Sequence, residues 1–344
     1  MVNFSCTKKV SPARSLVIYP APPDTTRIQY LTSFSNSKDI TSKRSAIQKT
    51  VLGDDLGIPI GKPYGIATTP GKIFICDATI RGLEIIDLAK KTLTPFVPSG
   101  KGQLKLPLNC FADTDGKLYV TDGERKEVVI FDASLNYISA IGKSDTSDNF
   151  RPLDVCASSE KIWVTNPRDN KVYVYQKPDY KLVGSFPDSK PGEAGFLNNP
   201  INICYRDEKI YVTDFGDFKI KIFTDDGRYL NSVGQYGKAL GQFVRPKGIA
   251  VDKDNNLYVV DAGFENIQVF NNKGNLLMFF GGPYKSHGDM WLPAKVHIDY
   301  ENLSYYKKWV SPEYILDYLI FVSNQYGPDK ISVYGAVKPA PKMK

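Results

Sequence analysis

The fold of this chain of 344 residues is decided by one stretch, residues 246–280, which reads PKGIAVDKDNNLYVVDAGFENIQVFNNKGNLLMFF. A short apolar strand comes first (248–251), then a polar turn, then a strand that ends in Asp261. A third strand, a second polar turn and a fourth strand (276–280) follow. Alternating apolar residues between turns rich in Asp, Asn and Gly are the signature of antiparallel strands. The stretch therefore predicts a sheet of four short strands.

The same pattern occurs six times along the chain. Each copy opens with a proline, and the prolines stand 44 to 48 residues apart, at Pro63, Pro107, Pro152, Pro200, Pro246 and Pro293. The second strand recurs at 73–77 (IFICD), 118–122 (LYVTD), 162–166 (IWVTN), 210–214 (IYVTD) and 319–324 (LIFVSN). Units of four strands that repeat about every 45 residues are typical of the blades of a β-propeller. We therefore predict an all-β chain that folds as a six-bladed β-propeller.

The sixth copy is one strand short, because the repeat ends after its third strand at 331–334. Residues 27–34 (RIQYLTSF) resemble the missing fourth strand, with residues 229–234 of the fourth copy as a parallel. A closed ring has no exposed strand edges, and exposed edges favour aggregation. We therefore predict that this N-terminal strand completes the last blade.

The repeat resembles that of the NHL family: a proline, a small apolar strand, a strand of the Leu-Tyr-Val-Thr-Asp type, an Ile-x-Val-Phe strand and a closing Gly. The resemblance covers residues 63–334 and implies a six-bladed propeller. The stretch LVIYPAPPD at 16–24 also resembles the leader of secreted bacterial NHL lipoproteins, in which a lipidated cysteine lies upstream. Cys6, which follows Ser5, stands in that place.

The resemblance implies a lipoprotein outside the cytoplasm, either periplasmic or extracellular on the cell surface. Contact with the outer membrane, or with another envelope membrane, would then be through the lipid anchor at Cys6 only. We divide the chain into a lipid-anchor and Pro-rich leader (1–26), the propeller (27–337) and a basic tail (338–344). The Pro-rich part of the leader suits an extended spacer between membrane and propeller.

Side chains on the inner strand of each blade point alternately towards the axis and into the blade. The residues three after each proline are all apolar and belong to the core, so their neighbours should face the axis. At one mouth of the channel we expect Asn109, Asp154, Asn202 and Lys295 as ligand candidates. Such oxygen donors suit Ca²⁺, but Lys295 would repel a cation. We favour a solvated polar contact between Asp154 and Lys295.

One layer deeper in the channel we expect Cys156, Cys204 and His297. Thiolate and imidazole ligands suit zinc or copper, and two cysteines on neighbouring blades also suit a disulfide. Small unpaired thiols in the core are the more ordinary arrangement. We therefore predict no metal and no other cofactor, with Ca²⁺ on the axis as the alternative.

Residues 301–318 interrupt the sixth repeat between its first two strands. We expect part of this insertion to be helical, starting again after Pro312. Its aromatic residues are the candidate partner surface: Tyr305, Tyr306, Trp309 and Tyr314. Aromatic clusters favour protein contacts, while a lid packed on the end of the propeller is the alternative. The long loops 188–199 and 282–292 carry mixed charges and should lie at the channel mouth.

The inventory of motifs argues against catalysis. Two histidines, His287 and His297, are too few for the zinc site of the amidating lyases that the family includes. The chain has no Gly-x-Ser-x-Gly elbow and no phosphate-binding glycine loop, and no Cys-x-x-Cys-His motif for haem. The acidic residues that end the second strands are predicted to be turn formers, which bond their own backbone.

We predict an extracytoplasmic binding or scaffold protein that engages a partner protein or an envelope component through a propeller face. The family resemblance suggests a multihaem cytochrome or an envelope complex as the partner. The alternative is a cation-dependent, lactonase-like hydrolase that uses Asn109, Asp154 and Asn202. The net charge of +7 is scattered along the chain, without the basic stripe of a nucleic-acid binder. We therefore expect no nucleic-acid partner.

Overall fold

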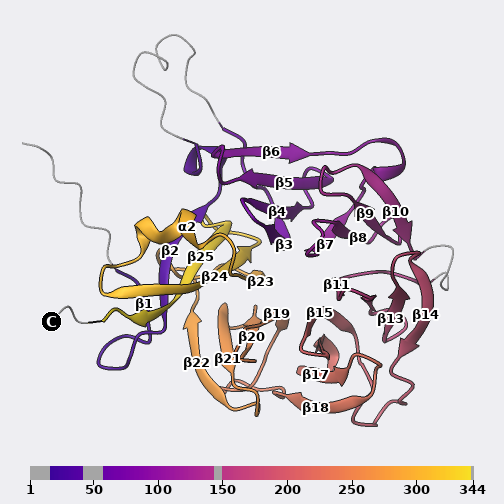
Figure 1. Cartoon of the computed structure of the whole chain (residues 1–344). Coiled ribbons are helices and arrows are strands. Elements are labelled where there is room, and N and C mark those ends of the chain that lie inside the picture. Colours follow the sequence, from indigo (N-terminus) through magenta and orange to yellow (C-terminus); the bar gives the residue numbers. More distant parts are fainter. Residues whose placement is uncertain (1–15, 42–56, 143–148, 342–344) are drawn as a thin grey trace, which may run out of the picture.

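A computed structural model describes residues 16–41, 57–142 and 149–341. The described chain forms six sheets arranged in a closed ring (Figure 1). This confirms the predicted all-β, six-bladed β-propeller. The candidate lipidation site, Cys6, and the last three residues of the basic tail lie outside the described residues.

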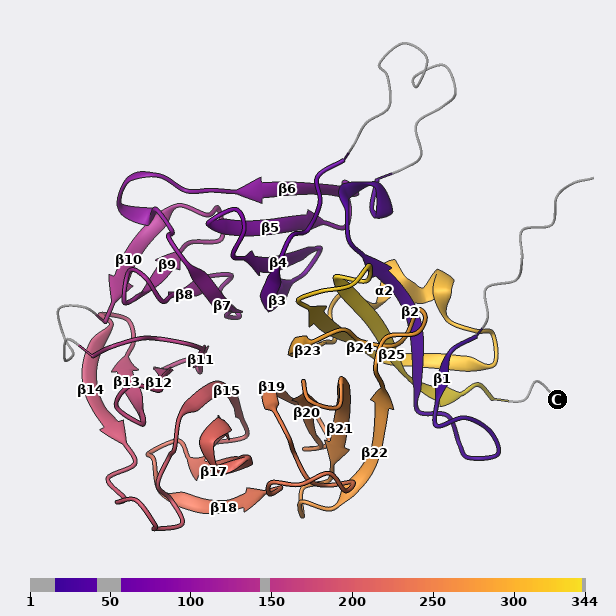
Figure 2. The same cartoon turned by 180° about the vertical axis from the view of Figure 1, so that it is seen from behind.

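Five blades are antiparallel sheets of four strands, with the first strand nearest the axis and the last at the rim (Figures 1 and 2). Blade 1 consists of β3 (Pro63–Thr69), β4 (Lys72–Asp77), β5 (Gly82–Asp87) and β6 (Thr92–Phe96). Blade 2 consists of β7 (Pro107–Ala112), β8 (Leu118–Asp122), β9 (Glu127–Phe131) and β10 (Tyr137–Ile141). Blade 3 consists of β11 (Val155–Ala157), β12 (Lys161–Asn166), β13 (Lys171–Gln176) and β14 (Lys181–Phe186).

The remaining blades follow the same order. Blade 4 consists of β15 (Pro200–Arg206), β16 (Lys209–Asp214), β17 (Lys219–Thr224) and β18 (Tyr229–Val233). Blade 5 consists of β19 (Pro246–Val251), β20 (Leu257–Asp261), β21 (Asn266–Phe270) and β22 (Leu276–Gly281). Blade 6 contains β23 (Pro293–Asp299), β24 (Tyr314–Asn324), β25 (Ile331–Pro339), β2 (Ile28–Phe34) and β1 (Ile18–Tyr19). The short helices are η1 (Ser37–Asp39), η2 (Gly100–Gly102), η3 (Phe215–Asp217), α2 (Leu303–Tyr306) and η4 (Lys307–Trp309).

The N-terminal strand closes the ring as the sequence predicts. β2 pairs antiparallel with β25, from Ile28 opposite Ala336 to Phe34 opposite Ile331. Ile28 and Phe34 are buried in two different core clusters, one on each side of the blade. β1, within the stretch assigned to the leader, pairs with the outer edge of β2. The predicted propeller range ends at 337, and β25 continues to Pro339.

The two faces of the ring are defined by the strand directions. In each blade the inner strand begins where the second strand ends, so that Pro63 pairs with Asp77. The third strand begins at the same end, since Asp77 also pairs with Gly82. We call this end, with the connectors between blades, the proline face, and the other end the distal face.

The acidic residues that end the second strands accept two sets of backbone hydrogen bonds. One set comes from their own turn, as predicted, and the other comes from the connector ahead of the blade. The carboxylate of Asp77 accepts the N–H of Thr79 in its own turn at 2.8 Å. It also accepts the N–H of Gly61, in the connector ahead of the blade, at 2.6 Å. Asp122 and Asp261 hold their connectors in the same way. These buried side chains therefore fix where each inner strand begins.

Hydroxyl groups on four second strands each bond their blade to the next one. The donor–acceptor pairs are Thr121 to the Leu153 carbonyl (3.0 Å), Thr165 to Ile201 (3.1 Å), Thr213 to Lys247 (2.7 Å) and Ser323 to Tyr64 (2.6 Å). The acceptors are backbone carbonyls at the start of the inner strands, one residue after each proline. A buried carbonyl without a partner is costly, so these bonds hold neighbouring blades in register.

The expectation of a second helix after Pro312 is wrong. Residues 314–324 form the long strand β24, and Tyr314 already pairs with Pro339 of β25. Because β25 extends that far, its backbone groups need a partner strand, and this pairing overrides any local helical preference. The helical part of the insertion is confined to α2 and η4.

Deletion of residues 1–34 should destabilise the whole ring, since it removes β2 and the buried side chains of Ile28, Leu31 and Phe34. We expect the melting temperature to fall by more than 10 °C, because burying each such side chain contributes roughly 1.5–3 kcal/mol. Deletion of residues 1–15, which keeps β1 and β2, is the matched control and should lower the melting temperature much less. Equal melting curves for the two truncations would contradict the closure.

Candidate functional site

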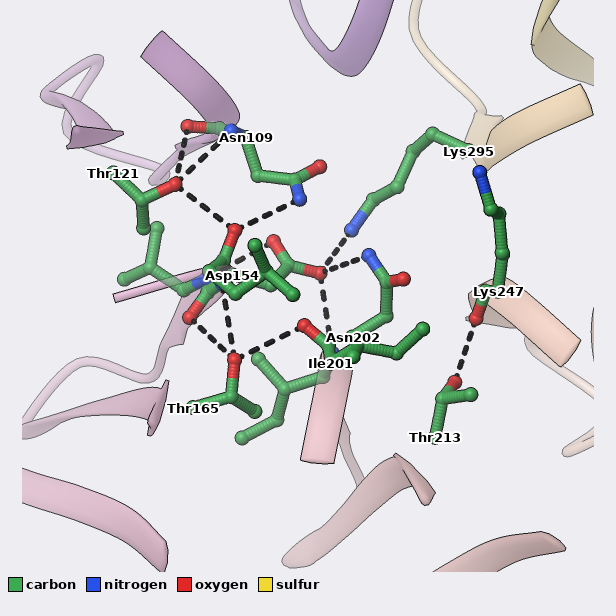
Figure 3. Close-up of polar contacts among 12 residues, drawn as sticks. Asn109, Thr121, Asp154, Thr165, Ile201, Asn202, Thr213, Lys247 and Lys295 are labelled. Atoms are coloured by element: carbon green, nitrogen blue, oxygen red, sulfur yellow. Dashed lines mark hydrogen bonds and ion pairs between the residues drawn. The ribbon is translucent and has the colours of Figure 1, made fainter. Parts of the chain in front are cut away.

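Three of the four residues predicted at the channel mouth meet on the axis. The ammonium of Lys295 forms an ion pair with Oδ2 of Asp154, and Figure 3 shows its side chain reaching across the axis towards that carboxylate. The pair joins blade 6 to blade 3. The amide of Asn202 donates to the same oxygen at 3.0 Å. Asn109 does not bond to this carboxylate; its amide donates to the carbonyl of Leu153 at 2.9 Å.

The Asp154 carboxylate is saturated with hydrogen bonds. In addition to Lys295 and Asn202, it accepts the N–H of Ile203 at 3.1 Å on Oδ2 and that of Val155 at 2.9 Å on Oδ1. Asp154 is fully buried, and Lys295 is 6% exposed. The expected contact between Asp154 and Lys295 is present, but the expectation that it is solvated is wrong. Six inner strands converge at this level, and their side chains exclude water.

This donor set does not fit Ca²⁺, the alternative that the sequence left open. Ca²⁺ takes six to eight oxygen ligands, several of them carboxylates. The axial layer holds one carboxylate, Asp154, which Lys295 already neutralises. The described residues contain no group of three or more His, Cys, Asp or Glu side chains placed to hold a metal ion. The layer therefore acts as a polar plug that closes the channel.

A cavity of about 280 Å³ lies on the distal side of this plug. The three residues predicted in the deeper layer, Cys156, Cys204 and His297, all line it, and Lys295 forms part of its floor. Burial raises the pKa of the Cys204 thiol to about 12 and raises that of Cys156 as well. Burial also lowers the pKa of His297 to about 4, and its Nε2 lies 2.9 Å from the Thr68 hydroxyl.

These shifts keep both thiols protonated and the imidazole neutral at pH 7. Metal binding requires thiolate rather than thiol, and both cysteines are free rather than bridged. The deeper layer therefore has the chemistry of an apolar cavity wall with weak polar groups.

The aromatic insertion is a clamp on the distal face. Tyr306 is 1% exposed and packs against Phe34 and Phe321 in the core, so its assignment to a partner surface is wrong. The insertion bonds to blade 1 through Asn302, whose amide donates to the Thr69 carbonyl at 3.1 Å. Tyr305 is exposed, whereas Trp309 and Tyr314 are half-buried. The insertion thus covers the junction where the ring closes.

The proline face carries the residues that the sequence reasoning missed. Large apolar side chains are exposed on its connectors and turns: Leu106, Tyr236, Leu240, Trp291 and Tyr326, the last four with exposed fractions of 47–65%. Lys62 and Arg245, which precede two of the blade prolines, are also exposed there. Trp291 belongs to the loop 282–292 that the sequence placed at the channel mouth. The others were missed because connectors carry no strand periodicity, although aromatic residues just ahead of blade prolines are a usable signal.

The comparisons with known proteins agree with this architecture. A family described as "6-bladed beta-propeller" matches residues 194–336. The chain is a six-bladed β-propeller. No curated protein matches its sequence.

Among solved structures, a protein of unknown function from Bacteroides thetaiotaomicron is 14% identical, with a TM-score of 0.60 over 90% of this chain and 76% of that one. An inactive virginiamycin B lyase from Staphylococcus aureus with quinupristin is 17% identical, with a TM-score of 0.54 over 80% of this chain and 95% of that one. A chain of a nidogen/laminin complex is 15% identical, with a TM-score of 0.52 over 66% of this chain and 82% of that one. At such identities these similarities show the fold alone.

Replacing Asp154 with Ala should cost about 3–5 kcal/mol of unfolding free energy, because it leaves the Lys295 ammonium buried without its partner. The double variant D154A/K295M should recover much of that loss. Urea denaturation measures both effects. The matched control is D188A, which breaks the exposed pair of Asp188 with Lys171 (2.9 Å) and should cost at most about 1 kcal/mol. A D154A variant as stable as D188A would contradict a buried plug.

Proposed function

We propose that this propeller is a binding protein that engages an acidic partner protein through its proline face. The observation that carries the proposal is the combination of exposed aromatic side chains and unpaired cations on that face. Tyr236, Trp291 and Tyr326 are each exposed by 47% or more. Within the described residues, neither Lys62 nor Arg245 has an ion-pair partner.

The composition of the face supports a protein interface. Aromatic residues and Arg are enriched at such interfaces and include most of the side chains that dominate binding energy. Trp291 stacks on Tyr284 with ring centroids 6.1 Å apart, and the Lys62 ammonium lies 5.6 Å from the ring centroid of Tyr326. The aromatic surface is therefore held in place before a partner arrives, which lowers the entropic cost of binding.

The state of the axis supports binding rather than hydrolysis. A hydrolytic centre needs a base or a metal-bound water within reach of its substrate. The axial carboxylate, Asp154, is buried and fully hydrogen-bonded, and the thiols and imidazole of the distal cavity are held neutral by burial. The side chains that remain available to a partner lie on the faces of the ring.

We further propose that the protein works outside the cytoplasm, held to a membrane by lipid on Cys6. This rests on the Ser5-Cys6 pair, on the Pro-rich stretch that follows it and on the resemblance to NHL lipoproteins. Within the described residues there is no helix long and apolar enough to cross a membrane. A respiratory or envelope assembly, such as one with a multihaem cytochrome, is the expected setting for the partner.

The triple variant Y236A/W291A/Y326A should lose the partner. Each truncated aromatic at an interface centre costs more than about 1 kcal/mol, so we expect recovery of crosslinked partner to fall at least tenfold. The measurement is quantitative mass spectrometry after crosslinking in the native envelope. The matched control L230A/L277A/F279A removes equally exposed apolar side chains from the rim strands β18 and β22. Loss of the partner in the rim variant alone would place the interface elsewhere.

Cys6→Ser should release the protein from the membrane when it is expressed with its native export signal. The wild-type protein should partition into the detergent phase, since multiple acyl chains anchor stably whereas one holds only marginally. Phase partition followed by mass spectrometry of the N-terminal peptide measures this. An unmodified Cys6 in the native host would refute the lipid anchor and would leave the proposal for the proline face unchanged.

A further inference from the structure

A buried lysine, Lys247, lies beside the axis on the proline face. It directly follows Pro246 at the start of β19 and is 7% exposed. Its backbone is fixed, because its carbonyl accepts the hydroxyl of Thr213 at 2.7 Å (Figure 3). The position of this lysine is therefore set by the same bonds that join the blades.

The Lys247 side chain extends from blade 5 towards blade 1. Its ammonium lies 5.3 Å from the ring centroid of Tyr64, which is the residue after the proline of blade 1. The equivalent residue of blade 6, between them, is the small Ala294. Within the described part of the chain, the ammonium makes no hydrogen bond and no ion pair, and the tyrosine ring is its one polar contact.

The charges nearest to Lys247 are also positive. Arg245 and Lys62, both exposed on the proline face, act on its ammonium electrostatically. The carboxylate of the axial plug, Asp154, is already ion-paired with Lys295. None of these three cations has an ion-pair partner among the described residues. The carboxylates of Asp77 and Asp261 accept the backbone N–H groups of Lys62 and Arg245, but neither forms an ion pair with their side chains.

This arrangement is unfavourable for the isolated protein. The side chain of Lys247 is largely buried, although its ammonium is not sealed from water. A charged group that is largely removed from water and has no counterion destabilises the fold or loses its charge. The shift in Lys247 agrees, since burial, with Arg245 and Lys62 adding to it, lowers its pKa to about 8. Lys295, equally buried in the next blade, has its carboxylate partner, whereas Lys247 has none.

We propose that Lys247, Arg245 and Lys62 form a binding site for one oxyanion, a carboxylate or a phosphate group, on the axis of the proline face. The guanidinium of Arg245 suits two oxygens of such a group at once. The ammonium of Lys247 supplies the buried charge beneath it, over the ring of Tyr64. The site stands independently of the proposed partner, because a free anion tests it without one.

The first test measures thermal stability at low ionic strength with inorganic phosphate and sulfate. Both anions should raise the melting temperature of the wild type in a saturable way, as expected for a ligand that binds only the folded state. K247M, which keeps the apolar stem, should melt higher than the wild type without anion and should no longer respond to either anion. The matched control K307M, on the distal face, should behave as wild type. Equal responses of wild type and K247M would overturn the site.

The second test measures whether the protein takes up a proton when the anion binds. Sulfate, which does not titrate near pH 8, should raise the pKa of Lys247 when it binds, and the protein should take up a proton. Calorimetry at pH 8 in two buffers of different ionisation enthalpy measures this uptake. The charged groups that face Lys247 are Arg245 and Lys62, with Tyr64 beneath it. Binding without proton uptake in the wild type would refute the role of Lys247.

A third measurement distinguishes the sources of the oxyanion. An oligoglutamate peptide that binds at least tenfold more tightly than inorganic phosphate identifies an acidic protein segment as the natural donor, and the reverse order identifies a phosphate group. Either order of the two affinities supports the site, provided that K247M abolishes the binding of both ligands. Peptide binding that survives in K247M but is lost in Y236A/W291A/Y326A would retain the proposed face and reject the axial site.

Discussion

The pairing of β2 with β25 is the contact on which the rest of the structure depends. Without it the sixth blade would have three strands, and no strand from the start of the chain would tie the last blade to the first. The pairing buries Ile28 and Phe34 in clusters on opposite sides of the blade, so one strand from the start of the chain seals the core near its end. Because the ring is closed, the inner strands of opposite blades lie at fixed positions. Contacts across the axis become available only then.

The closed ring explains why the axial polar groups serve the fold. Lys295 in blade 6 reaches Asp154 in blade 3, and Asn202 in blade 4 donates to the same carboxylate oxygen. A buried ion pair adds stability only when its remaining hydrogen-bonding capacity is satisfied, and backbone N–H groups of β15 and β11 meet that condition for the Asp154 carboxylate. The plug lies between the distal cavity and the proline face, and Lys295 forms part of the floor of that cavity.

Lys295 and Lys247 show how the same residue type takes different roles in one ring. Both are buried near the axis, and both start from inner strands of neighbouring blades. One is neutralised inside the protein, whereas the other faces only cations and a tyrosine ring. Natural proteins sit just above the stability that they need, and functional sites are where unfavourable groups persist. The unpaired charge of Lys247 is therefore a feature of the proline face, together with the exposed aromatic side chains, and is not part of the plug.

Sequence patterns were enough to predict the number of blades, the order of their strands and the identity of the strand that closes the ring. Those features follow from local patterns: alternation along strands, turn residues at fixed offsets and one missing strand in the last copy. The sequence also brought Asp154 and Lys295 to one level of the axis, since alternation orients every inner strand alike. That this pair is buried and that Tyr306 belongs to the core became clear only from the packing of the folded chain. The same is true of the strand at residues 314–324 and of the lack of an ion-pair partner for Lys247 within the described residues. Each of these outcomes depends on atoms that are distant in the sequence, supplied by another strand of the same blade or by another blade. A repeat read along the chain contains no information about those contacts.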